Sequence, residues 1–342
     1  MGLSLVRGPD SPPWVLLVVL AVLEQAMVGP VAWENMLVEQ TIVMTGASRG
    51  IGWIAAQRLL AERPGAHLVI FSRGPSRELV DQPAVLDGRL SSIGCDLSSL
   101  PSTRDAADAV LQKLSAGGLP PLGALVCNAG VQHTNACTQT DDGFESTFAV
   151  NVLAHHVLIR RLQSALSPQD RIVVTVSDTH FGDLRHNLGM VPGPRWQPVE
   201  ALARPGAFDR PSSTTAGRRA YSTSKLASIH LIHEFARRFP SGPTIVGFNP
   251  GFVPGTDLAR EADVASRLVM RRIMPLLAVT PLASTPEQAG SWLASVVTGD
   301  LEAPTGAYID RDTVQRSSAQ SYDARRELEA WDAVERLTQS RL

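Results

Sequence analysis

"TIVMTGASRGIG", residues 41–52, joins a short apolar run to three glycines, Gly46, Gly50 and Gly52. The apolar run has the composition of a buried strand, and residues 50–63 repeat their apolar side chains at helical spacing. A helix that opens at a glycine-rich turn offers free backbone N–H groups and a partial positive charge. Glycine also lets the backbone approach a pyrophosphate closely. The stretch therefore predicts a phosphate-binding turn, although the spacing G-x-x-x-G-x-G alone also fits a tight turn that binds nothing.

Strand-like and helical segments alternate beyond this stretch. Apolar runs predict strands at residues 41–46, 66–73, 89–97, 122–130, 170–178 and 244–251. Helical spacing predicts helices at residues 50–63, 103–116, 144–166 and 219–239. Such alternation requires crossover connections, which produce a parallel sheet covered by helices on both faces. We predict an α/β fold with one domain at residues 39–330 and a C-terminal tail at residues 331–342.

Composition restricts the class of protein. The chain has 342 residues, 44% of them hydrophobic, which suffices for one large core or two modest ones. A formal net charge of −2, without a basic excess, argues against a nucleic-acid partner. Three widely spaced cysteines, Cys95, Cys127 and Cys137, fit a disulfide framework poorly. We expect reduced, mostly buried thiols in a cytoplasmic protein.

Residues 1–38 form an N-terminal extension that contains the uncharged run WVLLVVLAVL at residues 14–23. The run is short for a membrane-spanning helix, which needs about 20 apolar residues. Three interpretations stay open: a dispensable or mis-started extension with Met36 as the start, a membrane anchor, and a secretory signal peptide. Any membrane contact is expected through residues 14–23.

Two further segments are candidates for the substrate side. Residues 181–220 are rich in Pro, Gly, Arg and Ser, and a loop of this length in a compact domain is usually functional or disordered. Residues 267–283 are apolar with a basic patch, which fits a substrate lid, a membrane-contacting helix or ordinary packing. Both segments favour a fairly large, apolar substrate. His180, just after the fifth strand, is a candidate for lining the substrate cleft.

No metal site is predicted from the histidines. His155 and His156 are adjacent, so they point about 100° apart on a helix and cannot share an ion. His230 and His233 lie three residues apart, but the sequence offers no third ligand beside them.

Two arginines suggest which nucleotide the glycine turn binds. An acidic residue at the end of the second strand commonly binds the ribose hydroxyls of NAD. Here that strand ends in Arg73, and Arg49 lies within the glycine turn. An arginine pairs with a 2′-phosphate, whereas a carboxylate repels it. The two residues favour NADP(H) over NAD, unless both are ordinary solvated loop charges.

A tyrosine and a lysine four residues apart suggest the chemistry. Tyr221 and Lys225 share one face of the predicted helix at residues 219–239. A neighbouring ammonium stabilises a phenolate, so we expect Lys225 to lower the pKa of Tyr221 toward the working range of an acid–base catalyst. Ser177 ends the fifth strand, and the carboxyl ends of parallel strands face the ligand crevice. Its hydroxyl could bond a carbonyl oxygen as charge develops there.

These pieces together resemble the short-chain dehydrogenase/reductase family over residues of about 40 to 330. The matching motifs, in order, are TGASRGIG, CDL, NAG, the NV pair of the long helix, the strand-end serine, YSTSK and NPG. The resemblance implies a single Rossmann-like, doubly wound domain that binds a nicotinamide cofactor and transfers hydride between an alcohol and a carbonyl. The SR at residues 72–73, the SDTH at 177–180 and the C-terminal segment after residue 303 are similar to the branch of retinol dehydrogenases, the WW-domain oxidoreductase and protochlorophyllide reductases.

The resemblance also implies roles for individual residues. Tyr221 is the expected acid–base, Lys225 holds the nicotinamide ribose, Ser177 orients the carbonyl and Asn151 organises a water relay behind the lysine. Asp96 is expected at the adenine, although Asn151 could instead bend its helix and Asp96 could cap the next one. The expected cofactor-binding set is Gly46, Ser48, Arg49, Gly50, Ile51, Gly52, Arg73, Asp96, Leu97, Asn128, Ala129, Gly130, Tyr221, Lys225, Pro250, Gly251 and Thr256.

The chain departs from the family pattern in two places. The family often has a threonine five residues after the proline of PG, but here that place holds Gly255, so Thr256 is assigned with a shift of one residue. The distance from Ser177 to Tyr221 exceeds the family's usual spacing because of the insertion at 181–220. We therefore expect an NADP(H)-dependent oxidoreductase that acts on a small-molecule carbonyl or alcohol. The resemblance leaves two oligomeric states open: a homo-oligomer formed through the long helices, as is frequent in the family, or a chain whose polar extensions block that interface. The alternative is a non-catalytic NADP-binding regulatory or interaction protein on the same fold.

Overall fold

The computed structural model describes residues 39–74, 87–187, 189, 191–254 and 283–339. The apolar run at residues 14–23, Thr256 and nearly all of the segment 267–283 lie outside these residues. Among the described residues, none of the helices has both the length and the apolar character needed to cross a membrane.

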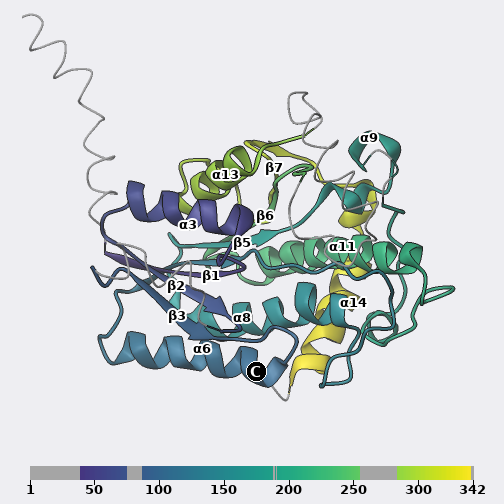
Figure 1. The fold of residues 1–342 in the computed structure, drawn as a ribbon, viewed down its shortest axis with the longest axis horizontal. Coiled ribbons are helices and arrows are strands. Elements are labelled where there is room, and N and C mark those ends of the chain that lie inside the picture. Colours follow the sequence, from purple (N-terminus) through teal and green to yellow (C-terminus); the bar gives the residue numbers. More distant parts are fainter. Residues whose placement is uncertain (1–38, 75–86, 188, 190, 255–282, 340–342) are drawn as a thin grey trace, which may run out of the picture.

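One eight-stranded sheet forms the centre of the molecule, in the order β3-β2-β1-β4-β5-β6-β7-β8 (Figure 1). The strands are β1 Gln40–Thr45, β2 Ala66–Ser72, β3 Leu90–Gly94, β4 Leu122–Cys127, β5 Arg171–Thr175, β6 Thr244–Asn249, β7 Tyr308–Asp310 and β8 Thr313–Gln315. All neighbours pair in parallel except β7 and β8. The strand order reverses between β1 and β4, and a ligand crevice is expected at such a switch point. The predicted single-domain, doubly wound α/β fold is confirmed.

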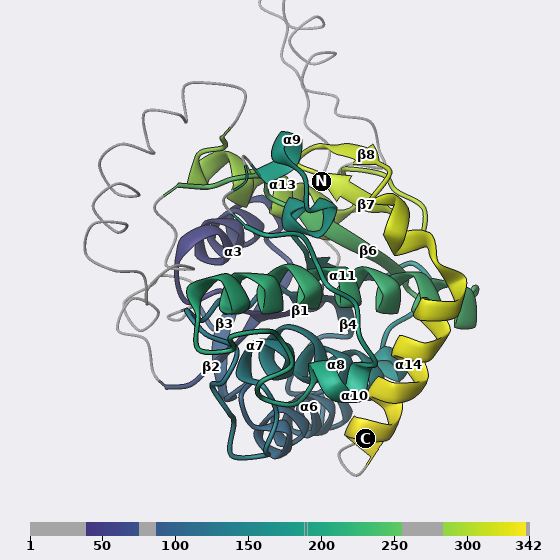
Figure 2. The same ribbon diagram turned by 90° about the vertical axis from the view of Figure 1, so that its right-hand side faces the viewer.

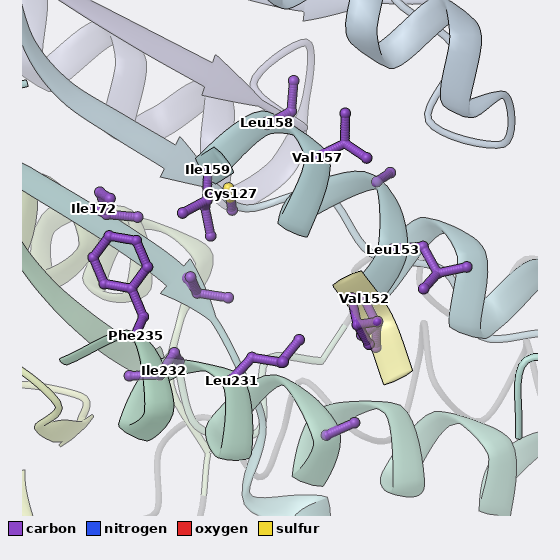
Figure 3. Packing of buried hydrophobic residues seen from close by; sticks show 14 of the residues in the cluster. Cys127, Val152, Leu153, Val157, Leu158, Ile159, Ile172, Leu231, Ile232 and Phe235 are labelled. Carbon is purple, nitrogen blue, oxygen red and sulfur yellow. The ribbon is translucent and has the colours of Figure 1, made fainter. Parts of the chain in front are cut away.

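The central strands are buried on both faces, because alternate side chains enter two different cores. On β1, Ile42 and Met44 pack with the core under α3 Gly50–Glu62 and α13 Pro286–Thr298. Val43 points the other way, into the core formed with α6 Leu100–Ser115, α8 Ala154–Leu162 and α11 Thr214–Arg238. Figure 3 shows this second core, where side chains of α8 and α11 meet Cys127 and Ile172 of the sheet.

The C-terminal helix α14, Ala324–Thr338, packs against the C-terminal part of α11 (Figure 2). It crosses residue 330, where we expected the domain to give way to a tail. Trp331 is only 4% exposed and joins the core under α11. One turn before Trp331 on α14, the carboxylate of Glu327 accepts hydrogen bonds from His233 and Arg237 of α11. The packed helix therefore extends to residue 338.

Several elements differ from the sequence prediction. The helix expected at residues 144–166 is divided into α7 Ser146–Phe148, a π turn Ala149–Leu153, α8 and a 3-10 turn Gln163–Ala165. The insertion at 181–220 is not a structureless loop, since it holds α9 Leu184–Asn187, α10 Val199–Leu202 and the first turns of α11. The strands β7 and β8 and the helix α13 were not predicted. Helix α13 begins with a capping box in which Thr285 and Gln288 bond each other's backbone.

Candidate active site

A cavity of about 1180 Å³ opens at the carboxyl ends of the parallel strands. It is bounded by the glycine turn after β1 and by the segments that follow β2, β3, β4, β5 and β6. Of the predicted site residues, those that line it are Gly46, Ser48, Arg49, Gly50, Ile51, Gly52, Arg73, Asp96, Leu97, Asn128, Ala129, Gly130, Ser177, Tyr221, Lys225, Pro250 and Gly251. Asn151 lies behind the cavity wall, and Thr256 lies outside the described residues.

The glycine turn is closed too tightly for any side chain at Gly52. A Cβ atom there would lie 2.2 Å from the carbonyl oxygen of Gly46 and 2.5 Å from Nδ2 of Asn128. Gly46 and Gly50 adopt positive φ values, +65° and +56°, which favour glycine. Asn128 holds the turn in place because its Nδ2 donates to the carbonyl oxygen of Gly46 at 3.0 Å. The backbone is thus shaped to come close to a ligand.

The first turn of α3 differs from the other long helices around the cavity. Helices α6, α11 and α13 begin with Ser99, Ser213 and Thr285, whose side chains each accept a backbone N–H of the first turn. Arg49 precedes α3 in extended conformation, and its side chain makes no capping hydrogen bond. The side chain before α3 therefore does not compete for the first N–H groups of the helix, as at helix ends that bind phosphate.

Asp96 does not cap the helix that follows it. That place is taken by Ser99, whose hydroxyl accepts the N–H of Ser102. The carboxylate of Asp96 instead accepts from the backbone and the hydroxyl of Ser98, at 3.0 and 2.8 Å. This local turn fixes Asp96 at the rim of the cavity, where it and Leu97 form part of the lining.

Tyr221, Ser177 and Lys225 meet at the floor of the cavity. The phenol of Tyr221 is 5% exposed, and the Ser177 hydroxyl lies close enough to it to influence its pKa. One turn further along α11, the ammonium of Lys225 lies 5.6 Å from the centre of the Tyr221 ring. Burial lowers the pKa of Lys225 to about 8. Ser177 lies just after the end of β5, and Tyr221 and Lys225 lie on α11, which packs against this part of the sheet.

The expected effect of Lys225 on Tyr221 is not what the structure shows. The pKa of Tyr221 is raised above its ordinary value, first because burial disfavours the phenolate and then because the Asp178 carboxylate lies nearby. The nearby Ser177 hydroxyl opposes this rise in pKa but does not cancel it. In this state Tyr221 is a neutral phenol, ready to donate a proton rather than to accept one.

Asn151 occupies the π turn that interrupts the long helix. Its side chain is fully engaged: Oδ1 accepts from the N–H of Val131 at 2.9 Å, and Nδ2 donates to the carbonyl oxygen of Val131 and the hydroxyl of Ser224. A Cβ atom on Gly130 would lie 3.6 Å from both Asn151 Oδ1 and Lys225 Nζ. Asn151 and Lys225 therefore both lie beside Gly130, and π turns are frequent at functional sites.

Several cavity residues were not singled out from the sequence. Asp178, Tyr308 and Asp310 line the part of the cavity beyond Ser177, and Phe181, Phe252 and Val253 give it apolar walls. Of these residues, only Asp178 could have been expected near the site from the sequence, because it directly follows the strand-end serine, Ser177. His180, expected in the cleft, is instead fully buried: Nδ1 donates to the carbonyl oxygen of Ser177 at 2.6 Å, and Nε2 accepts the N–H of Ser318.

The other histidines serve packing and ion pairs. His155 contacts Thr45 at 3.3 Å, whereas His156 pairs with Glu335. His233 bonds Glu327, and His230 packs edge-on against Trp196. Among the described residues, no group of three or more His, Cys, Asp and Glu side chains is arranged to hold a metal ion.

Comparison with known proteins identifies relatives along most of the chain. Residues 40–186 match the family model of short chain dehydrogenases. The WW domain-containing oxidoreductase of Danio rerio is 29% identical over 317 residues, covering 89% of this chain and 70% of that protein. Protochlorophyllide reductase A of Oryza sativa subsp. japonica is 30% identical over 334 residues, covering 89% and 82%.

Solved structures share the fold. A carbonyl reductase from chicken fatty liver, with NADPH bound, has a TM-score of 0.54 at 19% identity, covering 81% of this chain and 98% of that one. A short chain dehydrogenase from Burkholderia cenocepacia J2315, in complex with NADP, has a TM-score of 0.57 at 24% identity, with the same coverage. Because protochlorophyllide reductase A is 30% identical to this chain and is covered over 82% of its length, the chain belongs to the short-chain dehydrogenase/reductase family, in the branch of these oxidoreductases.

Proposed function

We propose that this protein is an NADP(H)-dependent oxidoreductase that interconverts a carbonyl group and an alcohol. The observation that carries the proposal is the meeting of Ser177, Tyr221 and Lys225 in the same cavity as the glycine turn. The first two residues supply hydroxyls for one substrate oxygen, and the third supplies a cation beside them. A fold retained only for regulation or interaction would not need all three.

The cofactor assignment is supported by the shape and charge of the cavity. The close approach at Gly46 and Gly52 and the uncapped start of α3 suit a pyrophosphate. Arg49 and Arg73 line the cavity, and the two described residues after β2, Arg73 and Gly74, include no acidic one, which suits a 2′-phosphate. NADPH bound in this cavity would supply the hydride that the carbonyl carbon receives.

The residues of the chain then manage the substrate oxygen and its proton. Ser177 and Tyr221 both bond the carbonyl oxygen, and Tyr221 gives up its proton as negative charge develops there. Lys225, charged below a pH of about 8, stabilises the resulting phenolate. A second cavity of about 20 Å³, lined in part by Asn151, His155 and Ser228, has room for one water molecule that could continue the proton path.

The test is a titration of the full chain with NADPH and with NADH, followed by turnover of a panel of aryl ketones by the wild type and by Tyr221→Phe. The proposal predicts tighter binding of NADPH, and a Tyr221→Phe variant that still binds NADPH but turns over about 10²–10⁴-fold more slowly. Equal or tighter binding of NADH would contradict the roles of Arg49 and Arg73 only. Full turnover by Tyr221→Phe would contradict the catalytic assignment, and failure to bind either nucleotide would favour the interaction protein.

A further inference from the structure

Three polar side chains beyond Ser177 take no part in the mechanism above. Asp178 follows Ser177 at the end of β5, while Tyr308 and Asp310 belong to β7; all three line the cavity. Asn249, at the end of the intervening strand β6, links two of them, Asp178 and Asp310. Its Oδ1 accepts the N–H of Asp178 at 3.2 Å, and its Nδ2 donates to Oδ1 of Asp310 at 2.8 Å.

Tyr308 is the member of this group that points to a ligand. Its side chain is only 3% exposed, with the ring packed edge-on against His180 at 5.2 Å between centroids. Within the described part of the chain, its hydroxyl meets no partner at full hydrogen-bonding geometry, although the side chain of Asn249 lies near enough to lower its pKa. A buried hydroxyl without a partner costs free energy, so such a group in a cavity wall is often completed by what the cavity binds.

The charges around the group favour a neutral ligand over a cation. Burial raises the pKa of Tyr308 most, and the nearby carboxylates of Asp310 and Asp178 raise it further. Arg311 and His186 act on Asp178 in the opposite sense and offset part of the negative charge. An ammonium ion could only donate to these residues, whereas a hydroxyl can both donate to the Asp178 carboxylate and accept from the Tyr308 phenol.

We propose that Asp178 and Tyr308 form a subsite for a hydroxyl group next to the reacting carbon, so that the preferred substrates are α-hydroxy carbonyl compounds and the matching vicinal diols on an otherwise apolar body. The position follows from Ser177, whose Oγ lies 3.4 Å from Oδ1 of Asp178. If Ser177 holds the carbonyl oxygen, the neighbouring carboxylate reaches the oxygen on the adjacent carbon. This inference rests on the proposed function and names its substrate class.

The experiment compares 2-hydroxyacetophenone with acetophenone as NADPH-dependent substrates of the full chain. The wild type is expected to favour the hydroxy ketone in kcat/KM by about tenfold or more, as for one hydrogen bond to a charged group. Tyr308→Phe and Asp178→Asn are each expected to bring this ratio at least severalfold closer to one. Because an α-hydroxyl also alters carbonyl reactivity, the change of the ratio is decisive. Tyr322→Phe, a matched variant of a tyrosine outside the cavity lining, should keep the wild-type ratio.

A second measurement does not depend on turnover: calorimetry of 1-phenyl-1,2-ethanediol against 1-phenylethanol on the NADP⁺ complex. The diol is expected to bind tighter in the wild type and to lose this advantage in Tyr308→Phe, whose unchanged affinity for NADPH would show that it is folded. Equal binding of the two alcohols, or a preference that survives in both variants, would overturn the subsite while NADPH binding leaves the proposed function standing. A wild type that binds no NADPH overturns both.

Discussion

The ammonium group of Lys225 donates a hydrogen bond of 2.7 Å to the carbonyl oxygen of Thr175, the last residue of β5. Ser177 follows two residues after the end of this strand. The contact therefore ties the face of α11 that carries Tyr221 to the strand end that carries the serine. It also satisfies a charge that burial makes costly, since the pKa of Lys225 is lowered from 10.5 to about 8.

This lowered pKa predicts a loss of cofactor affinity in mild alkali. The Lys225 ammonium is present below a pH of about 8 and is lost as the pH rises through that value. If it holds the nicotinamide ribose, the Kd for NADPH should rise severalfold between pH 7 and pH 9.5. Lys225→Met should bind NADPH more weakly at pH 7 and change less over this range. Parallel curves for the two proteins would rule out the lysine as the source of the pH dependence.

Arg73 is predicted to set the choice between NADPH and NADH. In Arg73→Asp, a carboxylate would repel the 2′-phosphate and could bond the free ribose hydroxyls instead. NADPH affinity should fall by about tenfold or more, and the ratio of NADH to NADPH affinity should rise by at least that factor. Arg325→Asp makes the same charge change at a side chain that is 82% exposed on α14 and is the matched control. Similar losses in both variants would point to general electrostatics.

Gly52→Ala is predicted to damage both the fold and nucleotide binding. The new methyl group would lie 2.2 Å from the carbonyl oxygen of Gly46, so the turn has to open. Overpacking of this kind costs about 1–3 kcal/mol, which urea unfolding would measure, and NADPH binding should be lost with the shape of the turn. In Gly118→Ala the nearest atom lies at an ordinary 3.5 Å, so this control should retain NADPH affinity. A Gly52→Ala variant with wild-type affinity would contradict the assigned role of the turn.

The sequence predicted well those parts of the fold that depend on local pattern. The strands β1, β2, β4, β5 and β6 are almost continuously apolar because helices cover them on both faces, and this signal needs no tertiary information. The glycine turn was equally clear in the sequence, because Gly52 is required mainly by a close contact with Gly46, only six residues before it. For Asp178, the sequence suggested a place near the site only because this residue follows Ser177.

Other parts depend on contacts between distant residues. The π turn around Asn151 is stabilised by partners at Val131 and Ser224, which are 20 and 73 residues away. The short strand β7 pairs over only three residues with β6, so Tyr308 gave no sign of entering the cavity. The sequence predicted a lowered pKa for Tyr221 from one neighbour, Lys225. In the structure, burial and the Asp178 carboxylate raise this pKa instead. Burial of a particular hydroxyl cannot be deduced from its spacing in the chain.

Asp178 provides a prediction on stability. Burial, and then the charge of Asp310, raises the pKa of its carboxyl from 3.8 to about 6, while Ser177, His186 and Arg311 oppose the rise. The folded state therefore holds this proton more tightly than the unfolded state, and the wild type loses stability as the pH rises from about 4 through about 6. Asp178→Asn removes this penalty. Relative to wild type, its free energy of unfolding should increase by on the order of 1 kcal/mol between pH 5 and pH 8.

Urea unfolding of both proteins at these two pH values measures the difference. Asp105→Asn is the matched control, because it makes the same substitution at a carboxyl that is 64% exposed beside Arg104. If the offset between Asp178→Asn and wild type is the same at pH 5 and pH 8, the carboxyl does not titrate in this window and the raised pKa is refuted. If the offset grows as expected, Asp178 is confirmed as a carboxylate held at a cost in stability, as expected of a residue kept for binding.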